Sequence, residues 1–342
     1  MARRLIEVTG EGAVVLGPDV VCDGFIRSAQ VRVQTHVHAD HLHEFDSSKG
    51  VQQVLASERT HKLLCAIKNA DLPYRTNFES APYGEARPYG DCSVTMLSND
   101  HMLGSTQVAV ELSDGIRLGY SGDFSWPLDE VIQVDALVID STYGSPASIR
   151  EYSQADAEEA LGGLVLRGLS KGPVNLLAHR GTLQRALNVL AERIDFPVVG
   201  SKAQMAEAAI YIEEGYVISP IVDLDSEDGR AILAEGRYVR VFGTGDRRPV
   251  DPSAATTIKC SAFLSRGDSP FFALSDRSYS VALSDHADFN GTLAYVKATG
   301  ASEVVTDNFR GTHGGQLALE LRDRLGVSAR PSSNDHSAGW GT

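Results

Sequence analysis

The chain has 342 residues, of which 42% are hydrophobic and 22% charged, and its formal net charge is −14. This length exceeds what one compact core needs, so we expect a large layered domain plus a second module, and no stretch approaches the ~20 apolar residues of a membrane-spanning helix. The negative charge argues against general electrostatic attraction to nucleic acid, so contact with phosphate would require a local cationic patch or a bound metal.

The N-terminal residues and the cysteines indicate a cytoplasmic protein without disulfides. Glu7 and Glu11 interrupt the first apolar residues, so we expect no signal peptide. The cysteines lie far apart and form no C-x-x-C pair, which argues against a disulfide framework and a zinc knuckle. They are Cys22, Cys65, Cys92 and Cys260.

The first 140 residues are rich in short β-branched runs with period-two alternation, which is typical of strands. Residues 52–69 instead carry helical spacing. The pattern predicts two sheets built largely from hairpins. The expected strands are 13–16, 20–22, 31–34, 93–97, 107–112, 116–120 and 136–139.

The pattern changes after a helix expected at 155–170. From about residue 172 strands and helices alternate, which predicts a separate α/β module. The last part returns to the first style, and Ser, Asn and Gly dominate beyond residue 330. The expected elements are strand 173–177, helix 183–194, strand 197–199, helix 202–213, strand 278–283, helix 291–299, strand 304–306 and helix 317–325.

The main chemical signal is the string Thr35-His36-Val37-His38-Ala39-Asp40-His41. At a strand end, the i, i+2 spacing puts His36 and His38 on the same side of the chain, so two imidazoles converge on one ion. Asp40 and His41 follow as the chain turns. Mixed nitrogen and carboxylate ligands suit zinc, and manganese or iron are alternatives.

This string resembles the H-x-H-x-D-H signature of the metallo-β-lactamase superfamily, and further positions match that family in order. Asp23 matches the acidic residue that orients the signature histidines, His101 the next histidine ligand, and Asp123 the carboxylate that bridges two metals. The resemblance implies an αββα sandwich with two zinc ions. His36, His38 and His101 would hold the first ion, Asp40 and His41 the second, and Asp123 both.

A narrower resemblance begins at Asp140-Ser141-Thr142-Tyr143-Gly144, directly after an expected strand. It is similar to a motif of the β-CASP nuclease branch, which includes mRNA 3′-end processing factors and DNA-repair exonucleases. Ser284-Asp285-His286-Ala287-Asp288 resembles the second motif of that branch. The likeness implies that His286 pairs with Asp140 and acts as general acid, because an imidazole beside a carboxylate suits proton donation near neutral pH.

The resemblance also implies a domain division. Residues 1–145 and 275–330 would form the metallo-β-lactamase domain, 146–274 an inserted α/β module of the β-CASP kind, and 331–342 a flexible tail. The third motif of the branch departs from its usual form here, because the tip of the strand at 304–306 carries Asp307 and Asn308. Either His313 or Asn308 would provide the last ligand of the second metal.

Three features are candidates for substrate contact. Arg180 lies where a strand gives way to a helix, a place that favours phosphate, although a plain strand-to-helix turn with a solvated Arg pair is the better explanation. Ser261 lies in a segment similar to the β-CASP loop that faces the cleft, and Arg310 could clamp a phosphate. We interpret His43, His61 and His336 as bystanders.

The combined expectation is a two-metal hydrolase that acts on nucleic acid, with RNA processing or decay as the first choice. DNA end processing is the rival with the same chemistry. A small-molecule hydrolase such as a lactonase or thioesterase would use the same metals without Asp140 or His286, and an inactive scaffold subunit would have lost metal ligands. The resemblance to the β-CASP branch also suggests a homodimer.

Overall fold

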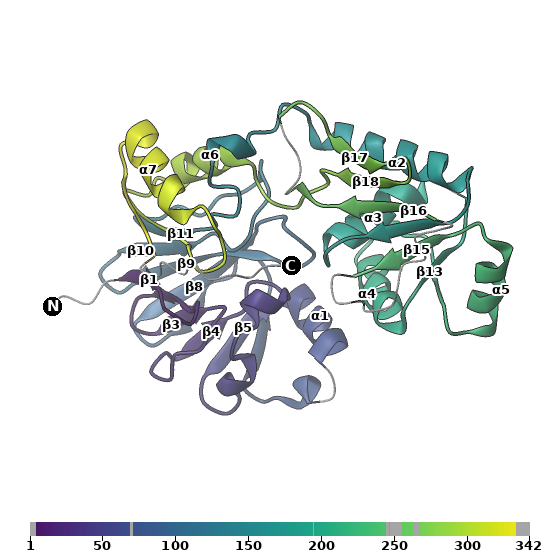
Figure 1. Cartoon of the computed structure of the whole chain (residues 1–342). Coiled ribbons are helices and arrows are strands. Elements are labelled where there is room, and N and C mark those ends of the chain that lie inside the picture. The colour runs from purple at the N-terminus through teal and green to yellow at the C-terminus, as the bar shows by residue number, and fades with distance from the viewer. Residues whose placement is uncertain are drawn as a thin grey trace. The chain divides into compact units, whose positions relative to one another are not determined.

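The computed structural model describes residues 5–68, 71–193, 195–243, 246, 255–262 and 267–332. The chain divides into two compact units, residues 1–148 with 286–342 and residues 149–285 (Figure 1). Across the described ranges, every helix falls short of the length and apolar character that crossing a bilayer requires.

The first unit contains two sheets. The first has the order β1-β2-β3-β4-β5-β6, with β1 Ile6–Val8, β2 Val14–Leu16, β3 Val20–Cys22, β4 Val31–Val33, β5 Gln53–Ser57 and β6 Phe78–Ala81. The second has the order β20-β19-β11-β10-β9-β8-β7, with β7 Arg87–Tyr89, β8 Cys92–Ser98, β9 Thr106–Leu112, β10 Arg117–Tyr120, β11 Ala136–Ile139, β19 Glu303–Thr306 and β20 Ser328–Pro331.

One apolar core joins these two sheets. Val31 and Val33 of the first sheet and Val108 and Val138 of the second belong to the same buried cluster. This unit has the helices α1 Glu58–Lys68, α6 Phe289–Thr299 and α7 Gly314–Leu325. Helix α1 contacts β5 and β6, and α7 contacts β19 and β20. Short 3₁₀ turns lie at η1 Ala39–His41, η2 Phe45–Ser48, η3 Leu72–Tyr74 and η4 Pro146–Ser148.

The two sheets were expected to consist largely of hairpins, but only some of the neighbouring strands pair antiparallel. Strands β1 to β3 and β7 to β10 pair antiparallel, whereas β3 to β6 and β10, β11, β19 and β20 pair parallel. The helix expected at 52–69 was wrong at its start, because residues 53–57 form the buried strand β5 and the helix begins at Glu58. A short apolar run buried on both faces does not distinguish strand from helix by periodicity alone.

The second unit is one sheet with helices. Its order is β14-β13-β15-β12-β16-β18-β17, with β12 Val174–Leu177, β13 Val198–Gly200, β14 Ile221–Asp223, β15 Val239–Phe242, β16 Thr256–Cys260, β17 Phe271–Ser275 and β18 Ser278–Val281. Its helices are α2 Gln154–Leu169, α3 Thr182–Ala191, α4 Lys202–Glu213 and α5 Glu227–Glu235. All pairs are parallel except the edge pair β17 and β18.

The boundary at the end of the second unit differs from the expected one. Residues 275–285 were placed with the first domain, but β18 pairs with β16 and therefore belongs to the second unit. Within the predicted tail, Pro331 closes β20 and the remainder after Ser332 lies outside the described residues. The α/β class is confirmed, while the family-specific αββα sandwich with a β-CASP insertion stays a prediction.

Candidate metal centre

The central site begins where β4 ends and the chain continues through the string at 35–41. His36 is fully buried, and the i, i+2 spacing brings His36 Nε2 to 3.1 Å from His38 Nδ1. Burial, followed by the neighbouring His41 and His38, lowers the pKa of His36 well below its usual range. His36 is therefore a neutral imidazole, which is the form that binds metals.

A second loop of the same unit brings His101 to this pair. The chain leaves β8 and passes through Asp100, which has a positive φ of 53°, before His101 turns inward. Gly104 closes the turn at φ 82°, where an added Cβ would lie 2.4 Å from the backbone nitrogen of Thr60. His101 Nε2 lies 3.1 Å from His38 Nδ1.

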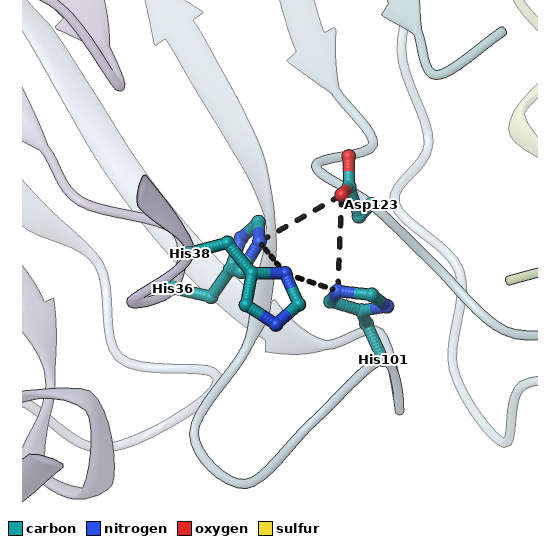
Figure 2. A group of neighbouring side chains, drawn as sticks. All are labelled: His36, His38, His101 and Asp123. Atoms are coloured by element: carbon teal, nitrogen blue, oxygen red, sulfur yellow. Dashed lines mark hydrogen bonds and ion pairs between the residues drawn. The ribbon is translucent and has the colours of Figure 1, made fainter. Parts of the chain in front are cut away.

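Asp123 approaches from the end of β10. Gly122 has a φ of 55°, and a Cβ there would lie 2.7 Å from the carbonyl of Thr106, so the turn requires glycine. The turn brings Asp123 Oδ2 to 3.7 Å from the Nε2 atoms of both His36 and His101 (Figure 2).

These four residues form one group that could hold a metal ion: their ligand atoms all lie within 4.8 Å of one another. The separations of 3.1 to 3.7 Å between these atoms compare well with about 3.4 Å, the edge of a tetrahedron whose corners lie about 2.1 Å from a zinc ion. Three imidazole nitrogens and a carboxylate are a donor set that suits zinc. The geometry therefore fits a bound metal.

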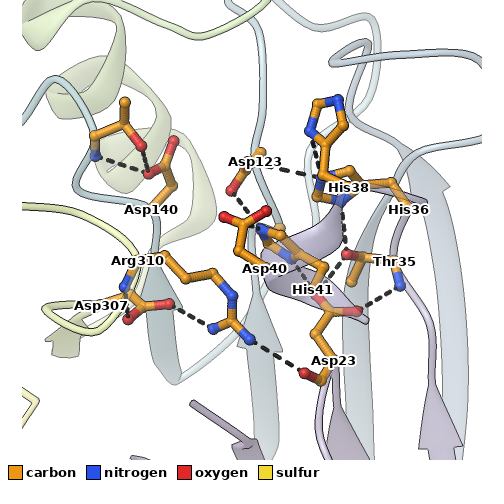
Figure 3. Close-up of polar contacts among 12 residues, drawn as sticks. Asp23, Thr35, His36, His38, Asp40, His41, Asp123, Asp140, Asp307 and Arg310 are labelled. Carbon is orange, nitrogen blue, oxygen red and sulfur yellow. Dashed lines mark hydrogen bonds and ion pairs between the residues drawn. The ribbon is translucent and has the colours of Figure 1, made fainter. Parts of the chain in front are cut away.

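His41 marks a neighbouring position. Its Nδ1 lies 2.7 Å from Asp23 Oδ2, and its Nε2 lies 3.3 Å from Asp123 Oδ1 and 3.8 Å from Asp40 Oδ2 (Figure 3). His41 Nε2 is buried and has no hydrogen-bond partner among the residues that the structure describes. An orphaned nitrogen between two carboxylates fits a second cation.

Electrostatics at His41 agree with this interpretation. Burial lowers the pKa of His41, but Asp123 and then Asp40 and Asp23 outweigh that effect and raise the pKa to about 10. A site negative enough to keep a proton on a fully buried imidazole also attracts a divalent cation. The side chain of Asp40 is 57% exposed, so this position is more open than the first.

Asp23 orients the histidines from beneath. Its Oδ1 accepts from the backbone N–H of Thr35 at 2.8 Å, and its Oδ2 accepts from the Thr35 hydroxyl at 2.6 Å. Thr35 Oγ1 lies 3.0 Å from His36 Nδ1. Nδ1 of both His36 and His41 thus faces this network, which leaves each Nε2 for a ligand.

Asp140 and His286 stand beside the centre as a pair. His286 Nδ1 lies 2.9 Å from Asp140 Oδ2, and His286 Nε2 lies 3.8 Å from Asp123 Oδ2. Asp140 Oδ1 accepts from the backbone N–H and the hydroxyl of Thr142. Asp123, Asp140 and His286 form another group with metal-binding geometry, so His286 is close enough to act at the same centre.

His313 and Asn308 were the alternatives expected to complete the second position. Neither His313 nor Asp40 belongs to a metal-binding group found among the described residues, but Asp40 Oδ2 lies 3.8 Å from His41 Nε2, whereas His313 precedes α7. Asn308 packs against Gly314, and its backbone N–H donates to the Ser332 hydroxyl. The choice between these two as last ligand finds no support in this arrangement.

Arg310 does not fit the expected contact with phosphate. Its side chain is 4% exposed and donates to Asp307 Oδ2 at 2.9 Å and to the carbonyls of Gly12 and Asp23 at 2.7 and 3.1 Å (Figure 3). The guanidinium joins the C-terminal loop to the turn that carries Asp23. A buried Arg with these partners is a structural link rather than a substrate clamp.

The other two substrate candidates lie in the second unit. Arg180 forms a bidentate pair with Glu207 at 2.9 and 2.8 Å. Ser261 is buried at the end of β16, where its backbone N–H donates to the carbonyl of Val281. The adjoining segment 263–266 lies outside the described residues, as does His336. Their contact with substrate stays a prediction.

Sequence reasoning missed Arg32 and Gln34, the buried polar residues that precede the string at 35–41. A signal was present, because a charged residue alternates with valines in a short strand. It also missed that the three non-glycine residues with positive φ in the described ranges, Asp23, Glu44 and Asp100, flank the metal-binding side chains. Such strained positions concentrate at functional sites.

Comparisons with known proteins give relatives that match different lengths of the chain. No protein-family model matches the chain. Over 133 residues the chain is 31% identical to a protein of Acidianus ambivalens described as an uncharacterized protein in lig 3′ region, which covers 37% of this chain and 94% of the relative. Over 320 residues it is 23% identical to a probable DNA ligase of Opitutus terrae, which covers 85% of this chain but 27% of that relative.

Solved structures bear on the fold alone. A protein of unknown function from Enterococcus faecalis V583 aligns with a TM-score of 0.54 at 13% identity, over 82% of this chain and 76% of that one. A metallo-β-lactamase of Cronobacter sakazakii aligns with a TM-score of 0.31 at 16% identity over 40% of this chain and 74% of that one, too weak a likeness to support an argument.

Proposed function

We propose that this chain, which belongs to the same protein family as the Acidianus ambivalens protein, is a metal-dependent hydrolase that cleaves phosphodiester bonds in nucleic acid. The observation that supports the proposal is the convergence of four ligand atoms on one point, with the His286–Asp140 pair 3.8 Å from the shared carboxylate. A small-molecule hydrolase would need the metal group but not this pair.

The metal-binding residues would divide between two positions. His36, His38, His101 and Asp123 would hold the first ion, and Asp40, His41 and Asp123 the second. Bound divalent ions supply a nucleophile at neutral pH and neutralise charge that develops on phosphate. The second position has an exposed ligand in Asp40, so we expect its ion to be weaker and exchangeable.

The chain's own residues would then supply the proton that the leaving oxygen needs. In hydrolysis, water adds to phosphorus and the bond to the leaving oxygen breaks, so that oxygen must gain a proton. Asp140 accepts from His286 Nδ1, which fixes the ring and directs Nε2 toward the centre. His286 Nε2–H donates the proton and is reprotonated from solvent.

DNA is the candidate polymer that a specific observation favours. The aligned Opitutus terrae protein is named as a probable DNA ligase, and this chain corresponds to 27% of it. An activity that prepares DNA ends would suit a neighbour of ligation. RNA, the first choice from the sequence motifs, remains the alternative substrate of the same chemistry.

The test is cleavage of matched single strands of DNA and RNA, labelled at either end. The full chain is treated with chelator, and zinc or manganese is added back. We expect cleavage only after metal is restored, and the ratio of DNA to RNA products assigns the polymer. Metal-loaded protein that cuts neither polymer would contradict the proposal.

A further inference from the structure

Two polar residues lie in and directly after the buried strand β4, which leads into the metal centre. Val31 and Val33 face the core between the sheets, so Arg32 in the strand and Gln34 after it face the opposite side. All four are fully buried. Each polar side chain must therefore satisfy its hydrogen bonds inside the protein.

Arg32 donates hydrogen bonds to the backbone of the loop that follows β4. Its Nη2 donates to the carbonyl of His41 at 3.1 Å, and its Nη1 donates to the carbonyl of His43 at 3.0 Å. Nε and Nη2 also donate to Gln34 Oε1 at 3.1 and 2.8 Å. The planar fork thereby fixes two backbone carbonyls and one side chain at once.

Gln34 extends the same network to the other side. Its Nε2 donates to the carbonyls of His36 and His41 at 2.7 and 3.0 Å and lies 3.1 Å from Asp23 Oδ1. The carbonyl of His41 thus accepts from both Arg32 and Gln34. Two hydrogen bonds therefore hold the backbone of His41. The imidazole Nε2 of this residue lies between Asp123 and Asp40 without a hydrogen-bond partner among the described residues.

The arrangement is costly for the strand itself. Burying a guanidinium requires compensation; the hydrogen bonds of Arg32 end on neutral oxygens, and Asp23 adds a favourable charge. An apolar residue would serve a buried strand better. The gain must therefore lie in what the side chain holds, which is the 41–43 backbone.

We propose that Arg32 and Gln34 are positioning residues that fix the His41–His43 backbone, so that His41 Nε2 stays directed at the metal position it shares with Asp40 and Asp123. The inference rests on the proposed metal centre. Arg32 donates directly to the carbonyls of His41 and His43 and reaches the His36 carbonyl only through Gln34, so its loss weakens the second position more than the first.

The test is Arg32→Lys in the full chain, with zinc titrated calorimetrically into metal-free protein and the bound metal counted by elemental analysis. Lysine keeps the charge, but its single nitrogen cannot reach Gln34 and both carbonyls together. We expect the affinity for the second zinc to fall by about 10- to 100-fold, the usual effect of losing a partner that orients a ligand. The affinity for the first zinc should fall less than that for the second.

Arg75→Lys is the matched control. Arg75 also lies over the ring of Phe45, at 5.4 Å from its centroid against 5.1 Å for Arg32. Its hydrogen bonds, however, go to Asp46 and Asp71 and not to the backbone of residues 41–43. The same substitution there should leave both zinc affinities unchanged.

Each outcome decides between the claims. A wild type that binds no zinc contradicts the proposed function itself, and one that binds a single zinc overturns this inference. Two wild-type affinities in Arg32→Lys, or equal weakening of both zinc ions, also overturn it. If Arg32→Lys fails to fold, Gln34→Leu is titrated instead and should also weaken the second zinc; failure of both to fold assigns the pair to the fold alone.

Discussion

Both units bury acidic side chains, but the two units satisfy these carboxylates differently. In the second unit, Arg180 pairs with Glu207, and Asp285 accepts from the Thr182 hydroxyl at 2.7 Å with Arg185 at 3.5 Å. Each anion there faces a donor of the protein. In the first unit, imidazole nitrogens and carboxylates face one another, and His41 Nε2 has no hydrogen-bond partner among the described residues.

The difference teaches how to separate a structural cluster from a binding site. A cluster that contains both charge signs neutralises itself and needs no ligand. A cluster made of acceptors with few donors is stable only with protons or a cation between them. The first unit therefore requires something that the second unit does not, and substitutions in the two clusters should have different consequences.

The largest expected effect is that of His36→Ala with His38→Ala. Removing two of four ligands should abolish binding of the first metal and lower nuclease activity by about a thousandfold or more, because the metal supplies the nucleophile. Metal content by elemental analysis and cleavage rates check this. Full metal content in the double variant would show that the ion binds elsewhere.

His286→Ala should separate chemistry from metal binding. Loss of a general acid lowers the rate by about 10²- to 10⁴-fold. The metal content should stay at the wild-type value if Asp123 and the histidines hold the ions. A fall in metal content equal to the fall in rate would make His286 a ligand instead.

Asp23→Asn tests the network beneath the ligands. The amide cannot accept from both Thr35 and His41 as the carboxylate does. The imidazoles of His41 and of His36, which contacts Thr35, therefore lose their orientation. We expect metal affinity to fall by about 10- to 100-fold with the fold retained. Zinc titration and circular dichroism measure the two quantities, and unchanged affinity would remove Asp23 from this role.

Glu207→Ala is the corresponding change in the second unit. It leaves the Arg180 guanidinium without its bidentate partner, which should lower the free energy of unfolding by about 1 to 3 kcal/mol. Thermal unfolding of the metal-free protein measures the loss. Because the cluster is self-neutralising, zinc affinity should not change, and a changed affinity would contradict the comparison.

The smallest expected effect is that of His313→Ala. His313 belongs to none of the metal-binding groups in the described part of the chain, so both zinc affinities should match the wild type and stability should change by less than about 0.5 kcal/mol. Zinc titration checks this directly. Loss of the second zinc would restore His313 as a ligand.

Sequence spacing was sufficient where the chemistry is local or ordered. The i, i+2 pair His36 and His38 follows from strand geometry, and the helix expected at 155–170 is α2, whose N-cap Ser153 and Asp156 form a capping box. Asp140 and His286, 146 positions apart, could be matched only through their order in a family pattern. Asp140 directly follows β11, whereas His286 lies between β18 and α6, where the backbone N–H of the next residue, Ala287, donates to the carbonyl of Phe124.

The partners of Arg310 could not be predicted in the same way. Two of its acceptors are the backbone carbonyls of Gly12 and Asp23, which lie 298 and 287 positions away. Every residue has a carbonyl, so no sequence pattern marks these two as acceptors. The strand β5 was missed because burial on both faces removes the alternation that distinguishes a strand from a helix.

Anomalous scattering from a zinc-soaked crystal, recorded on both sides of the zinc absorption edge, tests the central claim most directly. The account predicts a peak about 2.0 to 2.2 Å from nitrogen atoms of His36, His38 and His101 and from a carboxylate oxygen of Asp123. A zinc-loaded crystal without a peak among these four residues would contradict it.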